Sequence, residues 1–429
     1  MPDRPLLTLN RQRHRSLSGH LWIYRNEIES VAEGAVPGDV VEIRDGRGKA
    51  VGLGYWNPAS QITVRLLTRQ VATTVDAEFW RARLRTALAL RARVLPGDWP
   101  ARRLVNSEAD LLPGLIVDQY GDHVVFQLTT LGMDRWRDTW IEVLRSELRP
   151  AALVERSDMP VRTLEGVPAR AGYVHGSGDG AVTCRVNRAT FAFNLLDPHK
   201  TGFYLDQQAN YGLCVRHLTP GGRVLDAFCH LGGFAIHAAL AGAGEVIAVD
   251  QAEESIAGAR AAAALSGCPA IDFRCGNAFD VLKNAQTAGE RFDLIVLDPP
   301  TFTRTRAAVP GALRGYKEIH LRALRMLPVG GRLATFSCSH HVDAALFLET
   351  IVDAAADAGV LIRLEERLGA SPDHPVLPAV PETEYLKGFV FSVVEARTNE
   401  RSTDPLRHED CQLENRRSQA RGAGVAAPG

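Results

Sequence analysis

Residues 223–250 read RVLDAFCHLGGFAIHAALAGAGEVIAVD, and this stretch sets the fold class of the chain. Two short apolar runs rich in β-branched residues, RVLDAF and EVIAVD, flank a glycine turn and the helix-like segment FAIHAALAGA. Neighbouring parallel strands need a crossover of about this length, which is usually a helix. The stretch therefore predicts a β-α-β unit whose strands end at Asp226 and Asp250.

The same alternation continues toward the C-terminus. Three further apolar runs, IDFRCG, DLIVLDPP and RLATFSC, alternate with helix-like segments that include EESIAGARAAAALSG, LRGYKEIHLRALRML and VDAALFLETIVDAAADAG. Alternation of this kind is typical of a mainly parallel sheet with helices on both faces. We therefore expect an α/β, Rossmann-like domain over residues 191–396.

The preceding residues predict two smaller domains. GDVVEIRD, KAVGLGYW and QITVRLLT are short strand-like runs between turns, so residues 1–72 are expected to form a small antiparallel β-barrel. Residues 73–190 mix a helical pattern with paired strand patterns and are expected to form a central α+β domain. Residues 397–429 are polar and rich in arginine and small residues, which predicts a disordered tail.

Composition narrows the functional class. With 45% hydrophobic and 23% charged residues, the 429-residue chain has the make-up of a globular protein, and no apolar run is long enough to span a bilayer. The seven cysteines are scattered without a C-x-x-C pair, which argues against disulfides and a zinc site and favours a reducing cytoplasm.

Net charge is −1, but residues 1–72 hold ten Lys+Arg against seven Asp+Glu. This excess of positive charge is compatible with binding to the phosphate backbone of RNA, and equally with an ordinary solvated surface.

Polar residues at the strand ends predict a ligand site, because ligands of doubly wound sheets bind at the carboxyl ends of the strands. Asp250 can accept hydrogen bonds from both ribose hydroxyls of a nucleoside, which alone would also suit NAD. However, the glycine turn lacks the G-x-G-x-x-G spacing that holds a pyrophosphate. Asn277 and Asp298 add further polar groups at later strand ends. We therefore expect S-adenosylmethionine, a nucleoside without phosphate, as the cofactor.

Cys338 and Asp298 end neighbouring strands and predict the chemistry. Carbon 5 of cytosine is a poor nucleophile. A thiolate that adds to carbon 6 activates carbon 5 for attack on a methyl group. The addition also needs an acid that donates a proton to ring nitrogen 3. Cys338 and Asp298 are the candidate thiol and acid. Cys229 is expected to be a wall of the cofactor site, and the role of His340 and His341 stays open. The remaining cysteines before the tail are expected to be structural: Cys184, Cys214, Cys268 and Cys275.

Longer motifs carry a family resemblance over roughly residues 5–396. They include GHLWIYRNEIE, NSEADLLPGLIVDQYGD, HKTGFYLDQQAN, DAFCHLGGFA, FDLIVLDPPTF, TFSCSHH, DHPV and EYLKGF. In this order they resemble the large-subunit ribosomal RNA cytosine-C5 methyltransferases, which have an N-terminal PUA domain and a class I methyltransferase domain. The resemblance implies a cytoplasmic enzyme that makes 5-methylcytosine in large-subunit (23S) ribosomal RNA.

Specific residues follow from the resemblance and from the turn itself. Cofactor binding is expected from Gln207, Asp226, Phe228, Gly232, Asp250, Asn277 and Asp298, and the catalytic residues are expected to be Cys338 and Asp298. Lys200, Tyr204 and Arg314 match motif positions without an assigned role. The chain departs from the family at Thr301, where lysine is frequent, and at Gln208, where arginine is common.

Several alternatives stay open. DPPTF also resembles ribosomal RNA guanine methyltransferases, in which Cys338 would be incidental, and a catalytically silent RNA-binding assembly factor is a third hypothesis. In the first domain, Trp22, Tyr24, Tyr55 and Trp56 are candidates to stack on unpaired bases, although aromatics in small barrels are more often core. The sequence does not fix the target nucleotide, the form of the RNA substrate or the oligomeric state, for which a homodimer is one alternative.

Overall fold

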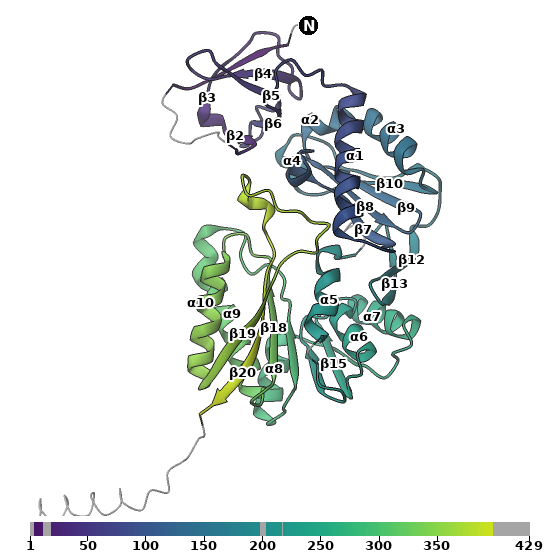
Figure 1. Ribbon diagram of the computed structural model, residues 1–429, viewed down its shortest axis with the longest axis vertical. Helices are drawn as coiled ribbons and strands as arrows, with labels where there is room; N and C mark the ends of the chain where they lie inside the picture. The colour runs from purple at the N-terminus through teal and green to yellow at the C-terminus, as the bar shows by residue number, and fades with distance from the viewer. Residues whose placement is uncertain (1–3, 12–18, 198–202, 217, 398–429) are drawn as a thin grey trace, which may run out of the picture.

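The C-terminal unit is built on the alternation that the sequence predicts (Figure 1). The computed structural model describes residues 4–11, 19–197, 203–216 and 218–397. The strands of this unit are β14 (Arg223–Asp226), β15 (Glu245–Asp250), β16 (Asp272–Cys275), β17 (Leu294–Leu297), β18 (Arg332–Ser337), β19 (Val360–Leu368) and β20 (Lys387–Ala396). They form one sheet in the order β16-β15-β14-β17-β18-β20-β19, in which only β20 runs antiparallel to its neighbours.

Helices cover both faces of this sheet, as expected for an α/β fold. They are α5 (Gln208–Val215), α6 (Gly233–Leu240), α7 (Glu253–Leu265), α8 (Ala278–Thr287), α9 (Val309–Met326) and α10 (Ala344–Ala358), with short 3-10 turns η3 (Leu205–Gln207), η4 (Arg306–Ala308) and η5 (Pro381–Thr383). Successive residues of β14 point to opposite faces: Val224 packs with α6 and α7, and Leu225 packs with α8, α9 and α10. The five predicted parallel strands are confirmed, whereas α5, α8, β19 and β20 were not predicted.

The central unit is a five-stranded sheet in the order β11-β10-β9-β8-β7. Its elements are α1 (Ala77–Val94), β7 (Ala101–Asn106), η2 (Ser107–Asp110), β8 (Leu115–Tyr120), β9 (His123–Leu128), α2 (Leu131–Asp134), α3 (Arg137–Leu148), β10 (Ala152–Ser157), α4 (Val161–Leu164) and β11 (Arg170–His175). One face packs on α1 and α3 through Trp80 and Trp140. The other face, with Tyr120 and Val125, joins the core of the C-terminal unit.

A hairpin of β12 (Ala181–Val186) and β13 (Ala189–Asn194) connects the two units. Its residues Cys184 and Phe191 lie in the same core as Phe203 and Phe234 of the C-terminal unit. The expected boundary at 190/191 therefore falls inside β13. Lys200 and the tail residues 398–429 lie outside the described part of the chain.

The N-terminal unit is a six-stranded sheet in the order β2-β6-β5-β4-β1-β3. Its elements are β1 (Leu6–Leu9), β2 (Trp22–Ile23), η1 (Arg25–Glu27), β3 (Ile28–Val31), β4 (Val40–Arg44), β5 (Ala50–Trp56) and β6 (Val64–Thr68). The expected antiparallel arrangement is wrong at one pair, because β1 runs parallel to β4. The expectation that Tyr55 could stack on RNA is also wrong: its ring is buried and its hydroxyl donates to the carbonyl of Pro113 in the central unit.

The long connection between β19 and β20, residues 369–386, reaches from the C-terminal sheet up to the other two units (Figure 1). Val380 is fully buried in the core of the N-terminal unit. Asp373 accepts hydrogen bonds from the backbone N–H of Arg103 at 2.7 Å and from the Gln208 side chain at 3.0 Å. This one connection therefore ties all three units together. No helix in the described residues has the length and hydropathy needed to span a membrane.

Candidate functional site

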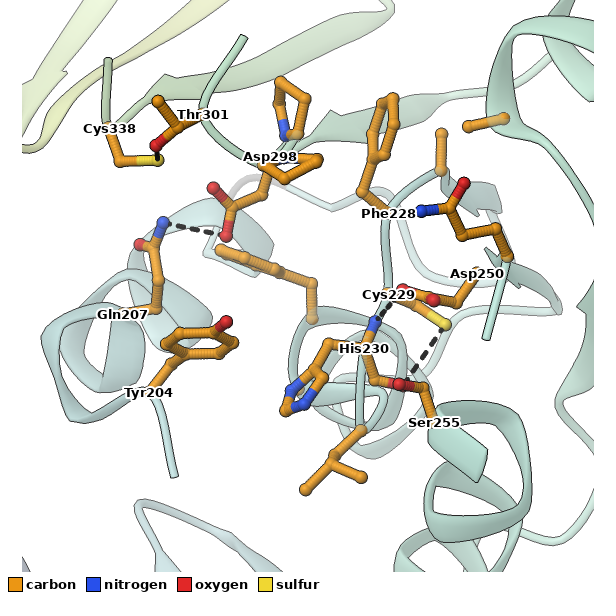
Figure 2. A pocket seen from close by; sticks show the side chains of 18 of the residues that line it. Tyr204, Gln207, Phe228, Cys229, His230, Asp250, Ser255, Asp298, Thr301 and Cys338 are labelled. Atoms are coloured by element: carbon orange, nitrogen blue, oxygen red, sulfur yellow. Dashed lines mark hydrogen bonds between the residues drawn. The ribbon is translucent and has the colours of Figure 1, made fainter. Parts of the chain in front are cut away.

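A pocket of about 620 Å³ opens at the carboxyl ends of β14, β15, β17 and β18 (Figure 2). The chain leaves β14 for β15 on one side and reaches β17 on the other, so the pocket lies at the point where strand order reverses. This is where doubly wound sheets bind ligands. Six of the predicted site residues line it: Gln207, Phe228, Asp250, Asn277, Asp298 and Cys338.

Two predicted residues, Asp226 and Gly232, are not part of the lining. Asp226 is fully buried, and its Oδ2 accepts a hydrogen bond from the backbone N–H of Ala235 at 3.1 Å while its Oδ1 has no partner. Burial raises the pKa of Asp226 to about 7. Gly232 has φ of +79°, a conformation that glycine adopts without strain, and leads directly into α6. Both residues therefore shape the loop that bounds the pocket.

Asp250 and Asn277 place polar groups on one side of the pocket. The Asp250 carboxylate accepts hydrogen bonds from the backbone N–H groups of His230 and Ala252, each at 3.0 Å, which fixes its position at the end of β15. Asn277 caps α8 by accepting from the N–H of Phe279 at 2.9 Å. No described residue accepts a hydrogen bond from its Nδ2, so this N–H₂ group can donate to a ligand.

Asp298 is held by a chain of side-chain amides. Asn210 donates from Nδ2 to Gln207 Oε1 at 2.6 Å, and Gln207 donates from Nε2 to Asp298 Oδ2 at 3.0 Å. Burial, together with the neighbouring Asp206 carboxylate, raises the pKa of Asp298 to about 8. Its carboxyl group is therefore largely protonated at neutral pH and can donate a hydrogen bond into the pocket.

Cys338 lies beside Asp298, one strand away, and faces the same pocket (Figure 2). Its Sγ is 3.1 Å from Thr301 Oγ1. Burial raises the pKa of the Cys338 thiol, and the Thr301 hydroxyl acts in the opposite direction because it can donate to a thiolate. Neither His340 nor His341 lines the pocket. Thr301, singled out in the sequence as a departure, thus contacts the candidate nucleophile.

The lining fits S-adenosylmethionine better than a dinucleotide. None of the described residues that line the pocket is Lys or Arg, and the turn before α6 lacks the G-x-G-x-x-G spacing that seats a pyrophosphate on a helix N-terminus. The polar groups are instead carboxylates and amides, which suit ribose hydroxyls, an adenine edge and a cationic amino acid. Asp250 and Asn277 would hold the nucleoside part.

Sequence reasoning missed part of the site and misjudged one cysteine. Asp206, which was not predicted, lines the pocket beside Gln207; it stands in the motif FYLDQQ, but its spacing alone assigns it no function. Tyr204, named in the sequence without an assigned role, also lines the pocket. Cys229 lines the pocket as expected. Cys184 and Cys214 are buried as expected of structural cysteines, whereas Cys275 is exposed at the end of β16, so a structural role in the core is wrong for it.

Comparison with known proteins gives two domain matches. Residues 7–69 match a PUA-like domain, and residues 218–363 match a methyltransferase domain. Among curated proteins, the chain is 38% identical over 392 residues to ribosomal RNA large subunit methyltransferase I of Tolumonas auensis, covering 90% of this chain and 98% of the relative. The protein of the same name from Aeromonas hydrophila is 38% identical over 379 residues, with 87% and 95% covered.

Solved structures show the same fold. A protein of Streptococcus mutans assigned as an S-adenosylmethionine-dependent methyltransferase superposes with a TM-score of 0.76 at 19% identity, covering 90% of this chain and all of that one. Another assigned methyltransferase, crystallised with S-adenosylhomocysteine, superposes with a TM-score of 0.75 at 19% identity, with 87% and 96% covered.

Proposed function

The chain belongs to the family of ribosomal RNA large subunit methyltransferase I, and from this premise we propose that it forms 5-methylcytosine in large-subunit ribosomal RNA through a covalent adduct of Cys338. The enzyme is S-adenosylmethionine-dependent. One observation carries the finer proposal: a thiol and a carboxyl group with its pKa raised to about 8 share the pocket at the ends of β17 and β18.

The reaction begins with the thiolate of Cys338 adding to carbon 6 of cytosine. As the S–C bond forms, the carbon 5–carbon 6 electron pair shifts onto carbon 5. The Thr301 hydroxyl, 3.1 Å from Sγ, stabilises the thiolate by donating a hydrogen bond to it. A desolvated thiolate with a raised pKa is a strong nucleophile once it forms.

Asp298 acts on the opposite edge of the ring. Its proton, kept by burial, passes toward ring nitrogen 3 and neutralises the charge that develops when the thiolate adds. The amide chain from Asn210 through Gln207 keeps the carboxyl group oriented. When bound, S-adenosylmethionine supplies the electrophilic methyl group that carbon 5 attacks. Carbon 5 then loses its proton to solvent, the Cys338 thiolate leaves from carbon 6, and ring nitrogen 3 returns its proton to the Asp298 carboxylate.

A guanine methyltransferase is the alternative that the DPPTF sequence favours, and it would make Cys338 dispensable. A protonated Asp298 argues against it, because an amino group that attacks a methyl donor is better served by a hydrogen-bond acceptor. Mass analysis of nucleosides from the methylated RNA separates the two products.

A covalent trap tests the proposal. Fluorine at carbon 5 cannot leave as a cation, so large-subunit ribosomal RNA transcribed with 5-fluorocytidine should hold the protein covalently in the presence of S-adenosylmethionine. Cys338→Ala should lose both the trapped species and turnover while retaining cofactor binding by calorimetry. Cys275→Ala, the same change at an exposed cysteine outside the pocket, should trap like the wild type. Formation of 5-methylcytosine by Cys338→Ala at a comparable rate would refute the thiol-addition mechanism.

A further inference from the structure

A second pocket, of about 350 Å³, lies between the central unit and the C-terminal unit. It shares Phe203, Tyr204 and Asp206 with the cofactor pocket, so the two cavities are neighbours. Its volume is at the lower end of the range of small-molecule sites, about 300–1,000 Å³, which suits a single heterocycle.

The floor of this pocket is one face of the central sheet. Arg103, Ile116, Gln127 and Arg156 come from the four consecutive strands β7, β8, β9 and β10 and all line it. Ile116 and Gln127 are direct cross-strand partners, which places them on the same face. Nearer the hairpin, this face packs an apolar core through Val125 and Val154. Arg103, Gln127 and Arg156 place polar groups on this face where it meets the pocket, and Asp118 lies beside them.

Gln127 is the residue that points to a ligand. Its side chain is 5% exposed, yet no described residue forms a hydrogen bond with its amide. Because Gln127 lines the pocket, its amide reaches the open space there, where it can donate to and accept from a ligand. Across the pocket, the Nδ1 atom of His374 forms a hydrogen bond with the Asp373 carboxylate. Its Nε2 atom has no hydrogen-bond partner among the described residues.

The charges of the pocket favour a neutral ligand. Arg103 is bonded through two nitrogens to Asp118, and Arg156 is bonded in the same way to Asp158, so both guanidinium groups are already neutralised. Asp206 adds a further carboxylate, which accepts from the Tyr385 hydroxyl at 2.7 Å. A phosphate would meet excess negative charge here, whereas an uncharged base with donor and acceptor groups would not.

We propose that this pocket binds a nucleobase of the substrate RNA next to the methylated nucleotide, with Gln127 hydrogen-bonding to the edge of the base. The inference rests on the proposed function only for the presence of an RNA substrate, not for the identity of the product. Proteins that recognise single-stranded RNA hold splayed bases against aromatic side chains and bond to their edges. Phe203 and Tyr204, shared by both pockets, separate the flanking base from the target. The target base itself belongs in the first pocket, because the methyl donor would bind there.

The first experiment measures substrate RNA. After the methylated nucleotide has been located in transcribed large-subunit ribosomal RNA, fragments around it are made with each flanking nucleotide abasic in turn, and methyl transfer from labelled S-adenosylmethionine is followed. In the wild type, one abasic position should raise KM about three- to tenfold, the equivalent of a neutral hydrogen bond or two. In Gln127→Met, KM should already be raised and the same abasic position should add nothing.

Gln119→Met is the matched control, since Gln119 lies on β8 outside both pockets. It should keep the wild-type response to the abasic position. The inference would be overturned if the increase in KM caused by Gln127→Met multiplied with the increase caused by every abasic position, because the two changes would then act independently. This holds even if the wild type transfers methyl groups normally. Absence of any methyl transfer by the wild type would instead refute the proposed function.

The second experiment needs no turnover. Met159 lines the second pocket, and the chain has only four methionines, so its labelled methyl signal in NMR reports on this site. With S-adenosylhomocysteine saturating, dinucleotides should shift the Met159 signal in the wild type, and Gln127→Leu should reduce that response at least threefold. Equal responses in both proteins, or no response to any dinucleotide, would overturn the inference.

Discussion

Asp298 and Cys338 are opposed in their protonation requirements. The proposed mechanism needs the thiolate of Cys338, whose pKa is raised by burial, and the neutral acid of Asp298, whose pKa is raised to about 8. Because the thiol pKa lies above that of Asp298, the fraction of enzyme with both groups in the required form should rise up to about pH 8, pass through a maximum above pH 8, and fall only when the pH exceeds the thiol pKa. Both limbs come from residues that line one pocket.

Replacing Asp298 tests the falling limb. Asp298→Asn keeps a hydrogen-bond donor at every pH but no longer transfers a proton, so kcat/KM should fall about 10²- to 10⁴-fold, as for loss of a general acid. The decrease at high pH should disappear in the same variant, because only ionisation of the thiol would then control the rate. A pH–rate profile at saturating cofactor makes the measurement, and an unchanged falling limb would assign it to another group.

Burial of the Asp226 carboxylate is unfavourable and should lower the free energy of unfolding once the carboxylate is charged. Its folded-state pKa of about 7 lies above the ordinary 3.8, so the folded protein binds the proton more tightly than the unfolded chain. Stability contributed by that proton is present below about pH 4 and is lost as pH rises to 7. Asp226→Asn removes the charge and should stabilise the cofactor-free protein at pH 8 by up to about 4 kcal/mol, from about 1.4 kcal/mol per pKa unit. Thermal unfolding at pH 5 and pH 8 checks this: the gain should be clearly smaller at pH 5.

At the scale of elements, the connection from β19 to β20 holds the units together through Asp373. This carboxylate is fully buried and accepts from Arg103 and Gln208, on β7 and α5 respectively. Asp373 is the first residue of the DHPV motif, so this motif includes a contact between the units. The same contact gives a structural role to Gln208, which stands where arginine is common in the family.

Removing the Asp373 carboxylate should leave several buried donors without partners. Asp373→Ala should lower the free energy of unfolding by about 3–5 kcal/mol, the usual cost of breaking a buried charged network. Asp357→Ala is the matched control, because Asp357 makes an exposed ion pair with Lys317 and should cost less than about 1 kcal/mol. Denaturant unfolding compares the two variants, and equal effects would mean that the connection does not tie the units.

At the scale of the whole molecule, the N-terminal unit is fixed rather than loosely tethered. Glu165 of the central unit accepts from Asn57, Ser60 and Arg65 of the N-terminal unit at 2.7–3.0 Å, and all of these side chains are buried. The cations of the N-terminal unit are therefore held in one position relative to the catalytic pocket.

The charge of this unit should govern the salt dependence of RNA binding. Arg44, Arg47 and Lys49 are exposed, and replacing all three with Gln should weaken binding to ribosomal RNA. Each lost phosphate contact makes the slope of log affinity against log salt shallower by about 0.7–0.9. The matched control changes the same net charge in the C-terminal unit, with Arg274, Lys283 and Arg291 replaced by Gln. Equal slopes for the two triple variants, measured by anisotropy, would show that the N-terminal cations do not contact RNA.

The amino-acid sequence by itself determined the fold class, and six of the eight site residues predicted from it line the candidate pocket. Strand and helix periods are local, so five parallel strands can be predicted from runs such as RVLDAF and EVIAVD. Once the strands are parallel, their carboxyl ends must share one edge. That geometry brings Asp250, Asn277, Asp298 and Cys338 together without any knowledge of long-range packing.

Only the tertiary structure decided what lies between the units. Gln127 is one polar residue in an ordinary strand pattern, and its unpaired amide has meaning only once the central sheet docks against Phe203 and Tyr204. In the same way, Asp226 satisfies every strand-end rule yet points into the core and away from the pocket lining. Contacts between residues far apart in the chain depend on how whole faces pack, and neither spacing nor composition encodes that packing locally.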